Sequence, residues 1–270
     1  MSTLAPLGRR LLTVTGRREV GPYVVLTAGD PEGPVPAAGQ FYMLAAAERW
    51  GGGEDERPLL PRAFSVLRAR ESSLEFMIEA VGPGTARLCE LQAGEGLHVL
   101  GPLGNGFTAP AQRRALLCGG GVGAAPLAIL QDELRASGVS ETALLGFRDA
   151  AHAAGAALLE DARIATDDGG AGHHGLVTEL LLAELDADPA CTVYACGPPP
   201  MLEAVRATCE QRAVPVQLAL ESGMACGYGA CFGCVVPLRD GSYARLCVDG
   251  PVLAGAELET CLAPGRGAPA

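Results

Sequence analysis

The stretch Cys226-Gly-Tyr-Gly-Ala-Cys231-Phe-Gly-Cys234, followed after twelve residues by Cys247, decides how the rest of the chain is interpreted. Its spacing, C-x4-C-x2-C…C, is the one by which four thiolates surround a plant-type [2Fe–2S] cluster. A zinc site is one alternative, although zinc sites more often use paired C-x2-C units. The other is four buried cysteines that merely lie near one another. The spacing favours a cluster with Cys226, Cys231, Cys234 and Cys247 as its metal ligands.

Three glycines lie inside this stretch, at Gly227, Gly229 and Gly233. A loop that folds tightly around a cluster needs backbone with positive φ, which glycine adopts without steric cost. Its N–H groups must also point inward at the sulfur atoms. We therefore expect all three glycines to serve the cluster loop.

The composition is that of a globular protein with more than one domain. The chain of 270 residues suggests two domains and a small third. No apolar run reaches the ~20 residues of a membrane span and no signal peptide is visible, so we expect a cytoplasmic protein with no membrane partner. A net charge of −11 without a basic stripe argues against binding to nucleic acid.

Six further cysteines lie outside the cluster motif. A disulfide framework would suit a small secreted domain, but these cysteines are diluted over a long chain with no export signal. Cys89, Cys118, Cys191 and Cys209 have apolar neighbours and are expected in the core. Cys261 lies in a tail rich in Pro, Gly and Ala and is given no role.

Residues 11–100 alternate between short β-rich runs and turns that contain Pro or Gly. Many short strands at this spacing are typical of an antiparallel barrel, which we place at residues 1–110. The segment 48–57 is too polar and glycine-rich for a strand and is expected to be an exposed loop. The predicted strands are 10–15, 23–28, 41–46, 64–69, 74–80 and 96–100.

After residue 112, predicted strands alternate with helices. Such units form a parallel sheet with helices on both faces, so residues 111–218 are predicted to be a doubly wound nucleotide-binding domain. Residues 219–270 then form a small C-terminal cluster domain, and the fold class is mixed β and α/β. The predicted strands are 115–118, 143–147, 163–165, 192–195 and 216–220, and the predicted helices are 125–136, 176–185 and 201–212.

A glycine-rich turn, Gly119-Gly-Gly-Val-Gly123, joins a predicted strand to a predicted helix. A dinucleotide pyrophosphate can rest on such a helix N-terminus, although the turn is not a full G-x-G-x-x-G and turns of this kind are common. Two later strands also end in polar or glycine turns, and open parallel sheets bind ligands at the carboxyl ends of their strands. The residues predicted to bind the dinucleotide are Gly119, Gly120, Gly121, Gly123, Thr166, Asp167, Asp168, Gly197 and Pro198.

In the barrel half, Arg62-Ala-Phe-Ser65 places a guanidinium and a hydroxyl three residues apart. A planar, permanently charged Arg suits a pyrophosphate, and Ser supplies a second hydrogen bond. The alternative is a surface Arg and a capping Ser. Gly84 and Thr85 then begin a predicted helix over 85–91, whose free N–H groups would form a second anion site.

The order of these motifs resembles the ferredoxin-reductase superfamily, in which a flavin barrel carries R-x-F-S and a nucleotide domain carries G-G-G-x-G and C-G-P-x-P-M. More closely, the chain resembles the family of electron-transfer subunits of NAD-dependent dihydroorotate dehydrogenase. The resemblance covers nearly the whole chain. It is carried by residues 101–107, 166–169, 194–201, 221–231 and 247–252.

The resemblance implies FAD in the barrel, a [2Fe–2S] cluster at the four cysteines, and NAD(H) in the second domain. Cys196 would lie near the nicotinamide and is the implied catalytic residue. This family usually has Pro where Ala63 stands, but Ala removes only a fixed φ and no hydrogen-bonding side chain. The implied FAD-binding residues are Arg62, Ala63, Phe64, Ser65, Met77, Ile78, Glu79, Gly84 and Thr85.

By the same resemblance, the chain passes electrons between NAD(H) and the FMN of a separate dihydroorotate dehydrogenase catalytic subunit, in pyrimidine biosynthesis and with two copies of each subunit. The four histidines lack metal-ligand or triad spacing, so the cofactors are expected to supply the chemistry.

Three other functions were weighed. A subunit of another NAD(P)H-dependent flavin and iron–sulfur complex would share most motifs. A self-sufficient oxygenase reductase usually carries a complete ferredoxin domain, which residues 219–270 are too few to form. A redox sensor would need no route for a hydride. The residues do not decide between NADH and NADPH, because Arg148, which follows a predicted strand, could bind the 2′-phosphate of NADPH. The resemblance favours NADH.

Overall fold

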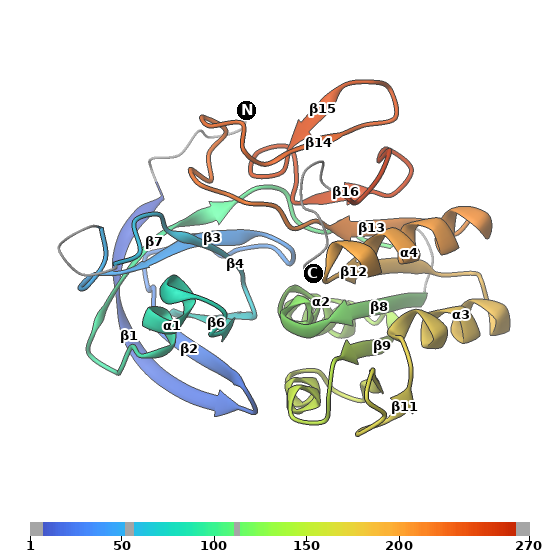
Figure 1. The fold of residues 1–270 in the computed structure, drawn as a ribbon, viewed down its shortest axis with the longest axis horizontal. Helices are drawn as coiled ribbons and strands as arrows, with labels where there is room; N and C mark the ends of the chain where they lie inside the picture. Colours follow the sequence, from blue (N-terminus) through green and yellow to red (C-terminus); the bar gives the residue numbers. More distant parts are fainter. Residues whose placement is uncertain (1–7, 52–56, 111–113, 263–270) are drawn as a thin grey trace.

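The computed structural model describes residues 8–51, 57–110 and 114–262, which form two seven-stranded sheets and a smaller C-terminal segment (Figure 1). The first sheet is antiparallel and curves into a barrel, with the strand order β4-β3-β7-β1-β2-β6-β5. Helix α1 (Pro83–Cys89) packs against β6 and β3. The strands are β1 (Arg9–Val20), β2 (Tyr23–Gly29), β3 (Phe41–Ala46), β4 (Arg62–Ser65), β5 (Arg68–Arg70), β6 (Ser73–Glu79) and β7 (Gly96–Leu103).

The single strand predicted at 64–69 is two strands in the structure. β4 pairs with β3 and β5 pairs with β6, so the chain crosses between the two edges of the sheet at Val66 and Leu67. Both residues are fully buried, because this crossing closes the barrel over its core. The first strand also runs further than predicted, since its hairpin with β2 continues to the pair Val20 and Tyr23.

The second sheet has the order β11-β10-β9-β8-β12-β13-β16. Its strands are parallel except β16, which runs antiparallel to β13 at the edge. All five residues of β12 are buried, as expected of a central strand covered on both faces. The strands are β8 (Arg114–Gly120), β9 (Ser140–Phe147), β10 (Arg163–Thr166), β11 (His173–His174), β12 (Thr192–Cys196), β13 (Val216–Ala219) and β16 (Val252–Ala254).

Helices cover this sheet on both sides. Helix α2 (Ala124–Ala136) and the 3-10 helix η2 (His152–Leu158) pack together, and α2 also contacts β5 of the barrel. Helices α3 (Val177–Ala187) and α4 (Pro199–Gln211) contact each other. A short 3-10 helix, η1 (Gly121–Gly123), links β8 to α2. The predicted fold class, an antiparallel barrel followed by a doubly wound sheet and a small C-terminal segment, is therefore confirmed.

The C-terminal segment is attached to the second sheet. It forms a hairpin of β14 (Val235–Pro237) and β15 (Tyr243–Arg245), then adds β16 to the edge of β13. No sequence pattern indicated this antiparallel strand, and with it the sheet is mixed rather than wholly parallel as predicted. Cys261, expected to have no role, is buried and its N–H donates to Glu203 Oε2 of α4 at 2.6 Å.

Two large hydrophobic clusters form most of the core of the described residues. One runs from the barrel to the inner face of the second sheet, including Val25, Leu67 and Leu145. The other joins the opposite face of that sheet, α3 and α4 to the C-terminal segment. Cys118, Cys191 and Cys209 are buried as expected, whereas Cys89 is half-buried.

Some expectations fall outside the described residues. The boundary predicted near residue 111 lies in 111–113, and half of the predicted loop 48–57 lies in 52–56. The domain limits 1–110, 111–218 and 219–270 remain predictions. Among the helices of the described part, none is long and apolar enough to cross a membrane.

Candidate functional site

The four motif cysteines lie together in the C-terminal segment and form two pairs. The Cys231 thiol is hydrogen-bonded to the Cys226 sulfur, and the Cys234 and Cys247 sulfurs are 3.3 Å apart. Cys226 and Cys247 are close enough to interact electrostatically, which links the pairs. Within residues 8–51, 57–110 and 114–262, no three His, Cys, Asp or Glu side chains converge on one point suited to a single metal ion. Two thiolate pairs suit a two-iron cluster better than one tetrahedral zinc ion.

The protonation of these sulfurs shows why the site needs a cation. Burial opposes ionisation of Cys226, but N–H groups of Tyr228, Cys231 and Ala230 point at its sulfur and lower its pKa to about 6. Burial and the neighbouring Cys234 sulfur raise the pKa of Cys247 to about 12. Four adjacent thiolates would repel one another, so all four can ionise together only around positive charge, which iron supplies.

The backbone of the cluster loop corrects one expectation. Gly227 and Gly229 have φ of 80° and 85°, as predicted, but Gly233 does not have a positive φ. The left-handed residue is instead Phe232, at φ 56°. A Cβ on Gly227 would lie 2.5 Å from Met43 Cγ in β3, so the loop also needs glycine there to pack on the barrel. The Gly229 N–H donates to Cys247 Sγ at 3.2 Å.

A cavity of about 620 Å³ lies between the barrel and the end of the second sheet. The barrel contributes the R-x-F-S strand, β6 and the start of α1, and the second sheet contributes Cys196 at the carboxyl end of β12. Residues 220–225 close the remaining side. The predicted residues that line it are Arg62, Ala63, Phe64, Ser65, Met77, Glu79, Thr85 and Cys196.

Arg62 is held in place at the mouth of this cavity. Its guanidinium lies 5.8 Å from the centre of the Trp50 ring and donates to the Leu60 carbonyl at 2.5 Å. A Cβ on Gly84 would come within 2.7 Å of Arg62 Nε, so glycine permits this close approach. The Thr85 hydroxyl accepts hydrogen bonds from the N–H groups of Val81 and Gly82, which fixes the turn before α1. The side chain of Ile78, also assigned to FAD, is fully buried in the barrel core.

Cys196 is buried between the flavin-sized cavity and the glycine-rich turn. A Cβ on Gly123 would lie 2.2 Å from the Cys196 carbonyl oxygen, so strand β12 and the turn are in direct contact. Burial, with a smaller contribution from the Glu221 charge, holds the pKa of the Cys196 thiol well above its ordinary value. Cys196 therefore presents a neutral thiol to the cavity.

A second cavity, of about 480 Å³, lies at the carboxyl ends of β8, β9 and β10. Of the predicted dinucleotide residues, Gly120, Gly121, Asp167 and Pro198 line it. Gly121 has φ of 55° and open space around it, so its backbone is accessible to a ligand.

The other predicted dinucleotide residues do not line this cavity, but they pack or form hydrogen bonds next to it. A Cβ on Gly119 would meet Leu145 and Leu127 within 3 Å, so this glycine allows the helix and strands to pack. A Cβ added at Gly197 would come similarly close to the backbone nitrogen of Gly120. Thr166 is buried and donates to the Ala171 carbonyl, and Asp168 accepts the N–H of Gly170.

His152, to which no role was given, joins the barrel to the second sheet beside this cavity. Its Nδ1 is 2.6 Å from Asp149 Oδ1 and its Nε2 is 3.2 Å from Glu79 Oε1 of β6. Arg148 lies 3.4 Å from carboxylate oxygens of both Glu79 and Asp149. Asp149 and Arg148 are neighbours of His152 in the sequence, but Glu79 lies 73 residues away, so no local pattern could have revealed the contact with the barrel.

A third cavity, also about 620 Å³, begins where the first ends, because Ala225 lines both. It runs along β3 and β7 and includes Trp50 and the predicted cluster ligand Cys226. Three apolar side chains of its lining are exposed: Leu59, Leu60 and Tyr228 are 70%, 48% and 42% exposed, whereas Arg9 and His98 add polar groups. The segment that forms one wall of the first cavity therefore leads directly to the cluster loop and to an exposed apolar groove.

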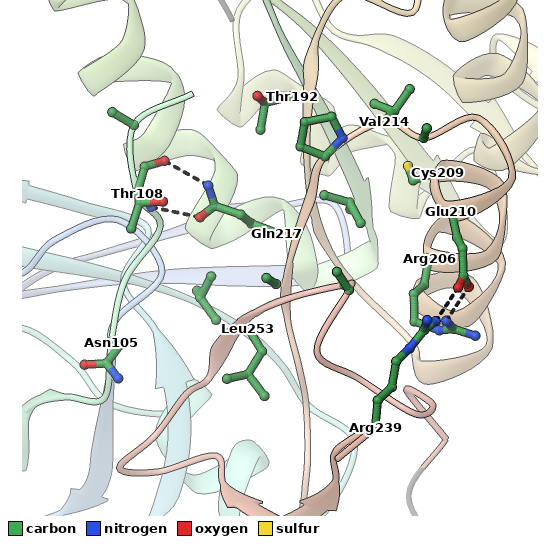
Figure 2. A pocket seen from close by; sticks show the side chains of 18 of the residues that line it. Asn105, Thr108, Thr192, Arg206, Cys209, Glu210, Val214, Gln217, Arg239 and Leu253 are labelled. Atoms are coloured by element: carbon green, nitrogen blue, oxygen red, sulfur yellow. Dashed lines mark hydrogen bonds and ion pairs between the residues drawn. The ribbon is translucent and has the colours of Figure 1, made fainter. Parts of the chain in front are cut away.

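A cavity of about 760 Å³ lies elsewhere, between α4, β13, β16 and the segment around Thr108 (Figure 2). None of the predicted site residues lines it. The Thr108 backbone exchanges hydrogen bonds with the Gln217 side chain at 2.8 and 3.1 Å, and Arg206 and Arg239 both pair with Glu210. We interpret it as a junction between parts of the chain.

Comparison with known proteins gives results for the sequence and for the fold. The family model described as the iron-sulfur cluster binding domain of dihydroorotate dehydrogenase B matches residues 221–259. The electron transfer subunit of dihydroorotate dehydrogenase B (NAD(+)) from Geobacillus kaustophilus (strain HTA426) is 37% identical over 265 residues, covering 93% of this chain and 99% of the relative.

Two solved structures share the fold. The NADH-dependent reduced ferredoxin-NADP oxidoreductase superposes with a TM-score of 0.78 at 24% identity, over 93% of this chain and 90% of the other. Phthalate dioxygenase reductase superposes with a TM-score of 0.62 at 15% identity, over 94% and 96% of the two chains. At these identities the likeness concerns the fold alone.

Proposed function

This chain belongs to the family of electron transfer subunits of dihydroorotate dehydrogenase B (NAD(+)), and from that premise we propose how its residues perform the transfer. As an electron transfer subunit, it works with a catalytic dihydroorotate dehydrogenase subunit. We propose that it connects NAD(H) to the FMN of that subunit, in pyrimidine biosynthesis, through FAD and a [2Fe–2S] cluster. When bound, the flavin would exchange a hydride with NAD(H), and the cluster would carry single electrons.

FAD is assigned to the cavity between the barrel and Cys196. Arg62 would bind the pyrophosphate, and its contacts with Trp50 and Leu60 support this role because they hold the guanidinium in one orientation. Ser65 and Thr85 line the same cavity. Ala63, Phe64, Met77, Ile78, Glu79 and Gly84 complete the proposed set.

NAD(H) is assigned to the cavity at the ends of β8, β9 and β10. The accessible backbone of Gly120 and Gly121 would hold its pyrophosphate at the start of α2. Gly119, Gly123 and Gly197 would act through packing, whereas Thr166, Asp167, Asp168 and Pro198 would shape the ribose end. The neutral thiol of Cys196 would touch the nicotinamide without adding charge beside the flavin.

One observation carries the proposal: residues 220–225 line the flavin-sized cavity and continue directly into ligand Cys226. This continuity supports a short route for single electrons from the flavin to the cluster. The ligands are Cys226, Cys231, Cys234 and Cys247, whose two sulfur pairs suit two irons. Such an arrangement has no purpose in an enzyme that only transfers a hydride.

We assign docking of the catalytic subunit to the apolar groove beside Cys226, with two copies of each subunit in the complex. The exposure of Leu59, Leu60 and Tyr228 supports this choice, because apolar side chains gathered at a surface mark a contact with a partner. A cytoplasmic location is part of the proposal, since cysteine ligands stay reduced in that compartment.

The test is to assay NAD+-dependent oxidation of dihydroorotate by the chain with and without the catalytic subunit. Alone, the chain should reduce dyes with NADH and leave dihydroorotate untouched, because we assign the dihydroorotate site to the catalytic subunit. The released flavin should be FAD, and about two irons and two labile sulfides should accompany it. Dihydroorotate oxidation by the isolated chain, or release of FMN alone, would contradict the proposal.

Two cysteine variants test the ligands. Cys231→Ser should lose the cluster, because Cys231 supplies one of the four sulfurs. Cys261→Ser is a matched control, since Cys261 is buried in the same segment but lies in the apolar core beside Glu203. Stoichiometric zinc without labile sulfide in the unmodified protein would show that the site is not a cluster.

A further inference from the structure

Arg245, the last residue of β15, reaches back across the cluster loop. Its guanidinium carbon lies 5.4 Å from the centre of the Phe232 ring, and its NH1 group donates to the Gly229 carbonyl at 3.5 Å. Asp249 also contacts it: its Oδ2 accepts the backbone N–H of Arg245 at 2.8 Å and lies 3.5 Å from Nε. Arg245 therefore contacts the cluster loop at Gly229 and Phe232 and the segment after Cys247 at Asp249.

The contact with Gly229 bears directly on a ligand sulfur. The Gly229 carbonyl and the Ala230 N–H belong to one peptide unit, and in a trans peptide they point in opposite directions. The Ala230 N–H is one of the donors to the Cys226 sulfur. Arg245 thus binds one end of a peptide whose other end is directed at Cys226. The stacking on Phe232 supports the left-handed backbone of that residue in the same loop.

The charge of Arg245 matters as well as its contacts. One-electron reduction adds negative charge to a cluster that four thiolates already make negative. Hydrogen bonds to the sulfurs and net charge nearby set the reduction potential of such clusters. A fixed cation beside the loop favours the reduced form, whereas the Asp249 carboxylate opposes that effect.

We propose that Arg245 is a positioning residue that orients the 229–230 peptide toward Cys226 and raises the reduction potential of the cluster, with Asp249 moderating it. This inference rests on the cluster ligands proposed above and goes beyond them, because it assigns a residue that is not a ligand. Arg245 lies two positions before Cys247, so the same short segment supplies a ligand and the group that adjusts it.

The test is a redox titration of the cluster followed by EPR, on the protein with its FAD and cluster in place. Arg245→Gln should make reduction of the cluster three- to tenfold less favourable. For a one-electron transfer this equals a reduction potential lower by about 30 to 60 mV. Its EPR line shape should also change, because the 229–230 peptide is released. Arg245→Lys keeps the charge and should lower the potential less.

Asp249→Asn should shift the reduction potential in the opposite direction. It retains an oxygen that can accept the Arg245 N–H but removes a negative charge, so the potential should rise. Arg239→Gln is the control, because it removes the same charge from the same segment at a side chain paired with Glu210 on α4. It should leave the potential and the EPR spectrum unchanged.

Unchanged potentials in both Arg245→Gln and Asp249→Asn, or shifts of the same sign, would overturn the assignment. If Arg245→Gln fails to retain the cluster while Arg245→Lys retains it, the positioning role is supported and Asp249→Asn still decides the effect of charge. Iron and sulfide analysis separates a failure of the proposed cluster ligands from a failure of the proposed role of Arg245. Unmodified protein without labile sulfide contradicts the ligands, whereas a full cluster with unaltered variant potentials contradicts only the role of Arg245.

Discussion

Gly227→Ala should release the cluster loop from the barrel. Gly227 has φ of 80°, and a non-glycine residue in the left-handed region costs about 1–2 kcal/mol. The added Cβ would lie 2.5 Å from Met43 Cγ and 3.2 Å from Leu103 Cδ1. Met43 is buried, and overpacking a well-packed core costs about 1–3 kcal/mol. The two effects together disfavour the native position of the loop by about 2–5 kcal/mol.

The effect should appear as loss of the cluster rather than loss of the fold. Native proteins have about 5–15 kcal/mol of stability, so both sheets should survive the substitution. Iron and labile sulfide per FAD, measured after anaerobic purification, should fall well below the unmodified value. In the fraction that retains a cluster, visible absorbance should bleach faster with a chelator.

Gly233→Ala is the matched control. Gly233 lies in the same loop but lacks a positive φ, and the nearest atoms to an added Cβ would be at 3.6 Å, an ordinary contact. It should retain iron and sulfide at the unmodified level. Full retention in Gly227→Ala, or equal loss in both variants, would refute the reasoning from backbone conformation and packing.

Three further outcomes are expected. Arg62→Ala should weaken FAD retention by about 1.5–3 kcal/mol, the range for a hydrogen bond to a charged group, as measured by equilibrium dialysis; unaltered retention would mean that the pyrophosphate binds elsewhere. Tyr228→Asp should impair co-elution with the catalytic subunit more than NADH-dependent dye reduction, and an equal loss of both would argue against docking at the groove. Arg206 lowers the pKa of Glu203 from 4.5 to about 2, so ionised Glu203 stabilises the fold above pH 4.5 and this contribution is lost as the pH falls toward 2. Glu203→Gln should therefore reduce the unfolding free energy at neutral pH by at most about 3 kcal/mol. The unfolding free energy of this variant should also fall less steeply as the pH is lowered from 4.5 to about 2. Urea unfolding measures both effects, and an equal pH dependence in the variant and the unmodified protein would contradict the prediction.

The parts of the fold that could be predicted from the sequence are those specified by short-range patterns. The cysteine spacing indicated the cluster loop, and the run of apolar residues before Gly119 indicated the central strand β8. Turn residues separated the barrel strands correctly except at Val66 and Leu67. There the chain stays apolar while it changes partner strand, because both residues enter the core where the barrel closes.

The parts that could not be predicted depend on partners far away in the chain. β16 is three residues long, and it is a strand only because β13 offers an edge to pair with. His152 has a role only because Glu79 of the barrel faces it. Besides Gly227 and Gly229, the cluster loop has a left-handed residue at Phe232 rather than at Gly233, since the loop conformation is set by contacts such as the one with Arg245 and not by residue type alone.

The pairing of β16 with β13 also bears on the order in which the protein is made in the cell. Synthesis runs from the N-terminus and earlier parts fold first, so the barrel and strands β8 to β13 of the second sheet can form before Cys247, the last of the four motif cysteines, leaves the ribosome. The Leu220 N–H binds the Pro251 carbonyl and β16 adds to a sheet edge that already exists, so both ends of the cysteine segment are fastened to a finished scaffold. We therefore expect iron to enter an open loop on a protein whose sheets have already folded. Protease treatment of iron-starved protein should cut within 221–250 and spare both sheets; cleavage throughout the second sheet would show instead that the metal is needed to build it.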